Sequence, residues 1–201
     1  MIGIIDYGMG NLASVEKAFA AVGHVAQIIR TPQAITDADK LILPGVGAFG
    51  SAMENLSQMD LLEPLRTAVG EGKPLLGICL GLQLLFQESE EYGLHEGLGV
   101  FDGRVRRLPA GVKVPHIGWN QVRIARESAL LEGIPDSSFF YFVQSYVVDP
   151  DDEDLVVGTT DYGERFVSMV ARENVFGVQF HPEKSQRVGL RMLKNFGDLP
   201  C

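Results

Sequence analysis

The stretch PLLGICLGLQLLF, residues 74–86, joins two segments with different apolar patterns. The run 74–78 is apolar apart from its glycine, as is typical of a strand buried on both faces of a sheet. The run 80–88 places apolar residues at helical spacing, which predicts a helix. Cys79 therefore stands at a strand-to-helix junction, with a glycine two residues away on each side.

A sharp turn of this kind strains the residue at its apex and crowds the residues two positions away. Gly77 and Gly81 have no side chain at those positions, so the segment GICLG has the form of a nucleophile elbow. Unpaired N–H groups at the start of the helix would favour the thiolate of Cys79, and the backbone N–H of Leu80 could donate to an oxyanion. A buried structural cysteine fits this pattern about as well, so a second component is needed.

The rest of the first half alternates short apolar runs with amphipathic segments, which indicates βαβ units on a parallel sheet. From Gly97 onward β-branched and polar residues alternate, which predicts appended antiparallel strands. We therefore expect an α/β fold with an open, mostly parallel central sheet, helices on both faces and an antiparallel β excursion, in one domain over residues 1–201. Strands are expected over residues 2–6, 25–29, 40–43, 74–78 and 175–180, and helices after the N-cap Asn11, up to about Glu71, and over 184–196.

Composition excludes several classes of function. The chain has 201 residues, 46% hydrophobic, and a formal net charge of -9 with scattered basic residues, which disfavours nucleic acid as a partner. It shows no signal peptide, and its longest apolar stretch is shorter than the roughly 20 residues of a membrane helix. We expect a cytoplasmic protein. Its two cysteines, Cys79 and Cys201, suggest neither a disulfide framework nor a zinc site, and we expect no metal and no cofactor.

The second component is His181-Pro182-Glu183, which follows the expected strand VFGVQF. Proline holds the preceding residue in extended geometry, so the imidazole and the carboxylate, two residues apart, can lie side by side. Glu183 could then orient His181 towards a nucleophile, as in a catalytic triad. A lone His-Pro-Glu is more often a turn that starts a helix. Together with the elbow, and at the same carboxyl edge of the sheet, it favours catalysis.

Two glycine-containing loops follow other strands. Pro44-Gly45-Val46-Gly47 is either an ordinary turn or the source of a second oxyanion donor. The segment GMGNLA, residues 8–13, matches a dinucleotide-binding pattern, but Arg30 rather than a carboxylate follows the second strand, so nucleotide binding is a minor alternative. Of the other histidines, only His116 could face a site, and no partner of ligand type is evident near it.

The motifs GICLGLQLLF, FGVQFHPEKS and PGVGAFG resemble those of the class I, or triad-type, glutamine amidotransferases, over nearly the whole chain. The segments DYGMGNL, PGVG and PHIGWN are similar to those of glutaminase subunits of imidazole glycerol phosphate synthase, in histidine biosynthesis. The resemblance implies hydrolysis of glutamine to glutamate through a cysteinyl thioester. It implies these roles: catalysis by Cys79, His181 and Glu183; an oxyanion site at Leu80, Val46 and Gly47; and glutamine binding by Gly47, Gln83, Ser145 and Tyr146.

The resemblance also implies a partner. In this family the ammonia passes to a separate cyclase subunit with a (β/α)8 barrel, forming a heterodimer, and the cyclase's nucleotide substrate activates the glutaminase. The positions that match the docking surface are Asn11, Trp119, Tyr141 and Lys184. Three alternatives stay open: a glutaminase of pyridoxal phosphate or anthranilate synthesis, a stand-alone cysteine amidohydrolase, and a nucleotide-binding regulatory domain.

Overall fold

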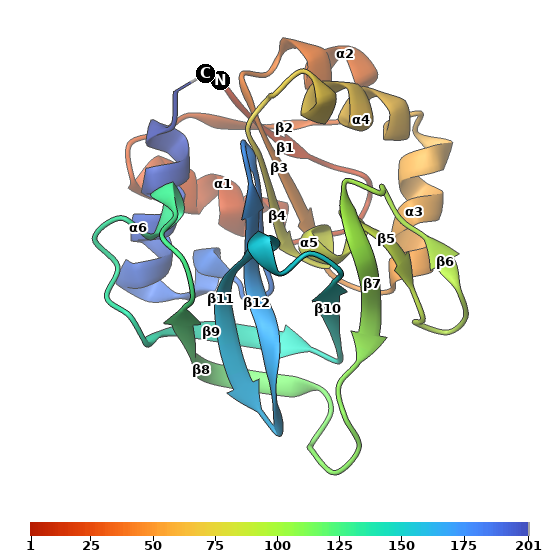
Figure 1. Ribbon diagram of the computed structural model, residues 1–201. Coiled ribbons are helices and arrows are strands. Elements are labelled where there is room, and N and C mark those ends of the chain that lie inside the picture. The colour runs from red at the N-terminus through yellow and green to blue at the C-terminus, as the bar shows by residue number, and fades with distance from the viewer. Residues whose placement is uncertain (201) are drawn as a thin grey trace.

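The computed structural model describes residues 1–200, so Cys201 lies outside the described residues. Its centre is a 13-stranded sheet, shown in Figure 1, whose main path runs in the order β2-β1-β3-β4-β13-β12-β10-β7-β5-β6. Five neighbouring strands of this path are parallel: β2 (Ala26–Ile29), β1 (Ile2–Ile5), β3 (Lys40–Gly45), β4 (Leu75–Cys79) and β13 (Val175–Val178). The predicted fold class is confirmed, whereas the single domain over 1–201 stays a prediction.

The topology brings three distant loops to one edge of the sheet. In the ladder between β3 and β4, Gly45 lies opposite Cys79, and in the ladder between β4 and β13, Ile78 lies opposite Val178. The strands run the same way, so their carboxyl ends meet at this edge. The elbow, the glycine loop at residues 44–47 and the segment after β13 therefore start side by side.

The remaining strands form the antiparallel excursion. β12 (Glu164–Arg172) pairs antiparallel with β13, and β10 (Tyr146–Pro150) and β7 (Phe101–Arg107) continue the path. β11 (Val156–Tyr162) joins β12 to a ribbon of β8 (His116–Ile124) and β9 (Ser138–Gln144), which lies in the lower part of Figure 1, below α6. β5 (Phe86–Ser89) pairs antiparallel with β6 (His95–Glu96) but parallel with β7.

Helices cover both faces of the parallel strands (Figure 1). α1 (Leu12–Ala21) and α6 (Gln186–Asp198) pack together on one face, where the rings of Phe19 and Phe196 lie 6.4 Å apart. The other face is covered by α2 (Pro32–Asp37), α3 (Phe49–Gln58) and α4 (Leu62–Gly70), which bury Phe49 and Leu56. Within residues 1–200 no helix is both long enough and apolar enough to cross a membrane.

Several local predictions need correction. The helix expected over 80–88 is only α5 (Leu80–Leu84), because Phe86 pairs with Phe101 and starts β5. Asn11 occupies the N-cap position of α1, but its side chain makes no capping hydrogen bond. The closing helix begins at Gln186, after a 3-10 turn over Pro182–Lys184. The structure also contains α2, which the side chain of Thr31 caps, and two more 3-10 turns, Ala129–Leu131 and Glu153–Leu155.

Candidate active site

Cys79 has the strained backbone that the elbow requires. Its φ is 56° and its ψ is -109°, in a region that side-chain-bearing residues rarely adopt. A Cβ on Gly77 would lie 2.7 Å from the carbonyl oxygen of Gly81, and a Cβ on Gly81 would overlap the carbonyl oxygen of Leu43. Only glycine fits at either position. Because α5 ends after five residues, its dipole contributes less to a thiolate than a full helix would.

His181 and Glu183 lie beside each other directly after β13. The Nδ1 atom of His181 is 2.8 Å from a carboxylate oxygen of Glu183, and the two side chains are 2% and 1% exposed. Glu183 contacts the Nδ1 atom, so the buried Nε2 atom is the one that faces Cys79. Among the described residues, Nε2 has no well-aligned hydrogen-bond partner. Burial alone lowers the pKa of His181, but the Cys79 sulfur and the Glu183 carboxylate outweigh it and raise this pKa to about 10.

The sulfur of Cys79 also contacts groups that the sequence did not reveal. The side-chain amide of Gln179 donates to it at 3.7 Å, and the carbonyl oxygen of Val143 lies 3.9 Å away. Gln179 is in turn held by Gln83, whose amide nitrogen donates to its side-chain oxygen at 3.1 Å. Gln179 stands two residues before His181, directly after β13, which ends at Val178 rather than at residue 180 as expected. A buried amide in an otherwise apolar run is the signal that could have identified it.

A cavity of about 270 Å³ opens beside Cys79, and the four residues predicted to surround glutamine, Gly47, Gln83, Ser145 and Tyr146, all line it. Among the described residues of its lining, Glu91 is the only carboxylate. One of its oxygens accepts a hydrogen bond from the backbone N–H of Phe49, at the start of α3, at 2.6 Å. Burial and the nearby Glu91 carboxylate raise the pKa of Tyr146. Sequence reasoning missed Glu91, because nothing local to it marks a site.

The predicted oxyanion residues Leu80, Val46 and Gly47 line the same cavity as Cys79. Gly47 has a φ of 104°, and a Cβ there would lie 2.5 Å from the Cε atom of Met9. Val46 is 41% exposed, so the peptide that joins it to Gly47 lies near the surface, where rotation meets little packing. The loop can therefore be both close to the sulfur and able to rearrange.

His116 is buried in the ribbon beside this cavity. Its ring stacks on Tyr162, with centroids 3.9 Å apart, and Asn120 contacts its Nε2 atom at 3.3 Å. Burial lowers the pKa of His116 despite a counteracting interaction with Gln144. Gln144, its cross-strand neighbour, lines the cavity, and among the described residues its buried amide is close to His116 but makes no well-aligned hydrogen bond.

Three of the four predicted docking residues lie together. The ring of Trp119 meets the ring of Tyr141 edge-on at 6.0 Å, and the ammonium of Lys184 lies 5.9 Å from the Tyr141 ring. Asn11 is exposed at the start of α1, which contacts the turn that carries Lys184. Ile117 and Phe139, 59% and 52% exposed, extend the same outer face of the β8–β9 ribbon, and the sequence analysis did not identify them.

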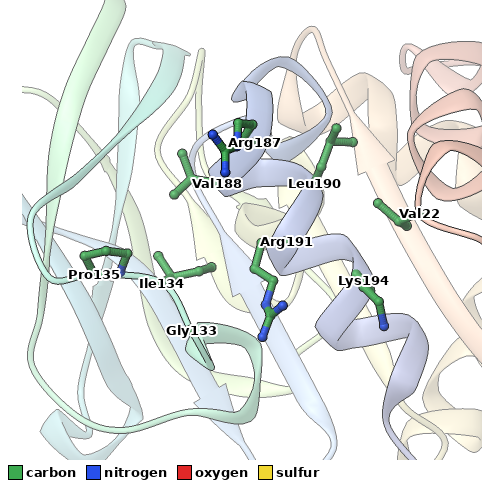
Figure 2. A pocket seen from close by; sticks show the side chains of 9 residues that line it. All are labelled: Val22, Gly133, Ile134, Pro135, Arg187, Val188, Leu190, Arg191 and Lys194. Carbon is green, nitrogen blue, oxygen red and sulfur yellow. The ribbon is translucent and has the colours of Figure 1, made fainter.

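A larger cleft, of about 660 Å³, lies along α6 (Figure 2). Arg187, Arg191 and Lys194 of α6 line it, opposite the loop that carries Ile134 and Pro135. None of the described residues in its lining is a thiol, an imidazole or a carboxylate. Nor do residues 1–200 hold a group of three or more side chains suited to a metal ion. The cavity beside Cys79 is therefore the candidate active site.

The comparison with family models agrees with this geometry. The model described as glutamine amidotransferase class-I matches residues 3–198. The chain belongs to the class-I glutamine amidotransferase family. This membership favours amide hydrolysis over the dinucleotide-binding alternative for GMGNLA, whose Gly8 instead donates its backbone N–H to Asp6, the partner of Arg30.

Two relatives of this amidotransferase are named imidazole glycerol phosphate synthase subunit HisH. The protein of Moorella thermoacetica is 57% identical over 198 residues, which cover 98% of this chain and 94% of the relative. The protein of Aquifex aeolicus is 55% identical over 194 residues, covering 96% and 94%. The alignments span almost the full length of all three chains.

Solved structures share the amidotransferase fold at much lower identity. A crystal structure of a glutamine amidotransferase superposes with a TM-score of 0.78 at 22% identity, covering 98% of this chain and 99% of the other. The structure of PurLQS from Thermotoga maritima gives a TM-score of 0.76 at 17% identity, covering 97% and 94%. At such identities the likeness concerns the fold alone.

Proposed function

We propose that this chain is the glutaminase subunit of an imidazole glycerol phosphate synthase, working in the cytoplasm in histidine biosynthesis. The observation that carries the proposal is that Cys79 lines the cavity and lies against His181, whose ring Glu183 in turn holds. It is supported by identity above one half to two subunits with that name. The cavity is small enough to suit a single amino acid.

The first half-reaction starts with a proton on His181, whose pKa is raised. The Cys79 thiolate attacks the side-chain carbonyl carbon of glutamine, and the negative charge moves to the amide oxygen. The N–H groups of Leu80 and of the Val46–Gly47 peptide stabilise this oxyanion. The carbon–nitrogen bond then breaks while the His181 imidazolium donates its Nε2 proton to the leaving nitrogen. The products are ammonia and a glutamyl thioester on Cys79.

The second half-reaction restores the resting state. His181, now neutral, accepts a proton from water as the water oxygen attacks the thioester carbon. The carbon–sulfur bond then breaks, which regenerates the Cys79 sulfur as the leaving thiolate, and the new carboxylic acid loses its proton to solvent as glutamate departs. Glu183 holds the ring in one orientation through both steps, because its contact with Nδ1 leaves only Nε2 to exchange protons.

The rest of the cavity suits the amino-acid end of glutamine. Glu91 offers a negative charge to the α-ammonium group, and its bond from Phe49 keeps the carboxylate in place. The backbone and side chains of Ser145 and Tyr146 line the same wall and provide donors for the α-carboxylate. The side-chain amide of Gln83 donates a hydrogen bond to the carbonyl oxygen of Tyr146 at 3.2 Å and completes this wall of the cavity.

The ammonia receiver is a separate cyclase subunit with a (β/α)8 barrel, and the two chains form a heterodimer. The cyclase docks on the outer face of the β8–β9 ribbon, where Trp119, Tyr141 and Lys184 cluster beside the exposed Ile117 and Phe139. Aromatic side chains next to a cation are typical of interface hot spots. The backbone N–H of His181 donates to the carbonyl oxygen of Tyr141 at 2.9 Å, so docking acts directly beside the proposed acid.

Glutamate release tests the proposal under three conditions: the chain alone, the chain with a cyclase subunit, and both with the cyclase's ribulosyl-formimino nucleotide substrate. We expect low turnover alone and full turnover only in the third condition, with none from Cys79→Ala. Full activity of the isolated chain would contradict the coupling to a cyclase. Activity of Cys79→Ala would contradict the chemistry.

A further inference from the structure

Tyr7 is a buried phenol beside the active site that the proposed reaction does not use. It follows β1 and is 1% exposed, and its hydroxyl donates to the carbonyl oxygen of Pro44 at 2.8 Å. Burial, and secondarily the charge of Cys79, raise the pKa of Tyr7, so the hydroxyl keeps its proton and remains a donor. This hydrogen bond joins the loop that follows β1 to the last residues of β3.

The hydroxyl lies against the base of the oxyanion loop. A Cβ on Gly45 would overlap the Tyr7 hydroxyl on one side, and on the other it would lie 2.9 Å from the Cβ of Leu80. Gly45 is also the cross-strand neighbour of Cys79. The peptide that leads into Val46 is thus enclosed between the phenol and the first residue of the elbow helix.

We propose that Tyr7 is a positioning residue for the oxyanion site. By holding the Pro44 carbonyl, its hydroxyl fixes the direction in which the chain leaves β3, and therefore how far the Val46–Gly47 peptide lies from the N–H of Leu80. Rotation is confined to the exposed part of the loop, while its base stays in register with Cys79. This inference rests on the proposed function, because it assumes that the reaction forms an oxyanion between these two peptides.

The test is Tyr7→Phe, which removes one oxygen and keeps the ring. Steady-state glutaminase kinetics are measured in the complex with the cyclase and its nucleotide substrate. We expect kcat to fall about tenfold with KM changed less than about twofold, since a misplaced donor weakens the transition state more than bound glutamine. Tyr162→Phe is the matched control, because its hydroxyl also donates to a backbone carbonyl, that of Lys113, at 2.8 Å, and it does not line the cavity.

A second measurement separates positioning from general damage. Alkylation of Cys79 by iodoacetamide forms no oxyanion, so its rate in Tyr7→Phe should stay within about twofold of the parent. An unchanged kcat, equal losses in kcat and in affinity, or an alkylation rate that falls in step with kcat would each overturn the inference. Cys79→Ala is assayed alongside: if it retains activity, the proposed function fails, whereas an inactive Cys79→Ala with an unaffected Tyr7→Phe rejects only the role of Tyr7.

Discussion

Gly81 shows how strictly the residues around Cys79 are specified. A Cβ on Gly81 would overlap the carbonyl oxygen of Leu43, and backbone atoms cannot yield as a flexible side chain can. We expect Gly81→Ala to lower the free energy of unfolding by about 3 kcal/mol or more. Gly70→Ala, at the end of α4 with nothing within 4 Å of the new Cβ, should instead raise it by about 0.5 kcal/mol. Urea denaturation of both variants measures the contrast, and equal effects would contradict it.

His181 makes stability depend on pH, with a definite sign. Its pKa is about 10 in the folded chain and 6.5 in the unfolded chain, so above pH 6.5 the folded state binds a proton that the unfolded state has lost. The contribution is complete below pH 6.5 and is lost as pH rises towards 10. We expect this contribution of His181 to fall over the window by up to about 1.4 kcal/mol per pH unit, measured as the difference between the parent and His181→Asn.

The same pH series on two variants identifies the source of the slope. His181→Asn has no group to titrate, and Cys79→Ala lacks the sulfur that raises the pKa of His181, so both should show a flatter profile between pH 6.5 and 9.5. Chemical denaturation at five pH values would measure it. A slope as steep in His181→Asn as in the parent would show that another group is responsible.

At the level of residues, the sequence reveals groups whose neighbours along the chain explain them. Cys79 stands between its glycines, and His181 is two residues from Glu183. Tyr7 and Glu91 were not predictable in this way, because their partners, Pro44 and Phe49, lie 37 and 42 positions away. Such contacts depend on which strand ends meet, and local pattern carries no information on that.

Among the elements, α5 and β5 mark the limit of periodicity as a guide. Every residue of Leu80–Leu84 is buried, so the segment has no polar face by which to distinguish a helix from a strand. The helix ends where Phe86 pairs with Phe101 of β7, a residue outside the local sequence that periodicity describes. The central parallel strands β1, β3, β4 and β13 were predictable because burial on both faces gives them continuous apolar runs.

The end of α6 depends on a buried lysine of another element. Lys40 at the start of β3 is 5% exposed, and its ammonium donates to the carbonyl oxygens of Gly197 and Leu199. Lys40→Met keeps the apolar stem but leaves these carbonyls without their charged donor. We expect a loss of about 2 to 3 kcal/mol in unfolding free energy.

Lys73→Met is the control for this contrast. Lys73 similarly donates to the carbonyl oxygens of Ile35 and Thr36 at the end of α2, at 2.8 and 2.7 Å, but this site is partly open to water. Water can replace the lost donor there, so we expect a cost below about 1 kcal/mol. Thermal and urea unfolding of both variants would measure the difference, and a Lys73 effect as large as that of Lys40 would contradict the role of burial.

For the whole molecule, strand order decides the site. Cys79 and His181 are far apart in the chain, and they meet because β13 enters the sheet next to β4. The sequence indicates that both follow strands, and hence that both lie at a carboxyl edge. It does not indicate that these two strands are neighbours, since the antiparallel excursion separates them in sequence. The family resemblance supplied what the pattern of residues could not.

The outer face of the β8–β9 ribbon gives the last prediction. Trp119 is 45% exposed and lies across the ribbon from Tyr141. A large aromatic side chain left in water by the isolated chain gains most when a partner covers it. We expect Trp119→Ala to weaken binding of the cyclase subunit about 30-fold or more. Phe139→Ser should weaken it less, because Phe139 lies towards the end of the ribbon.

Val25→Ser is the control and should leave the affinity for the cyclase unchanged. Val25 is 73% exposed, and it precedes β2, the first strand of the sheet path. Titration calorimetry of the four proteins measures the series, and equal affinities for Trp119→Ala and the parent would place the docking surface elsewhere.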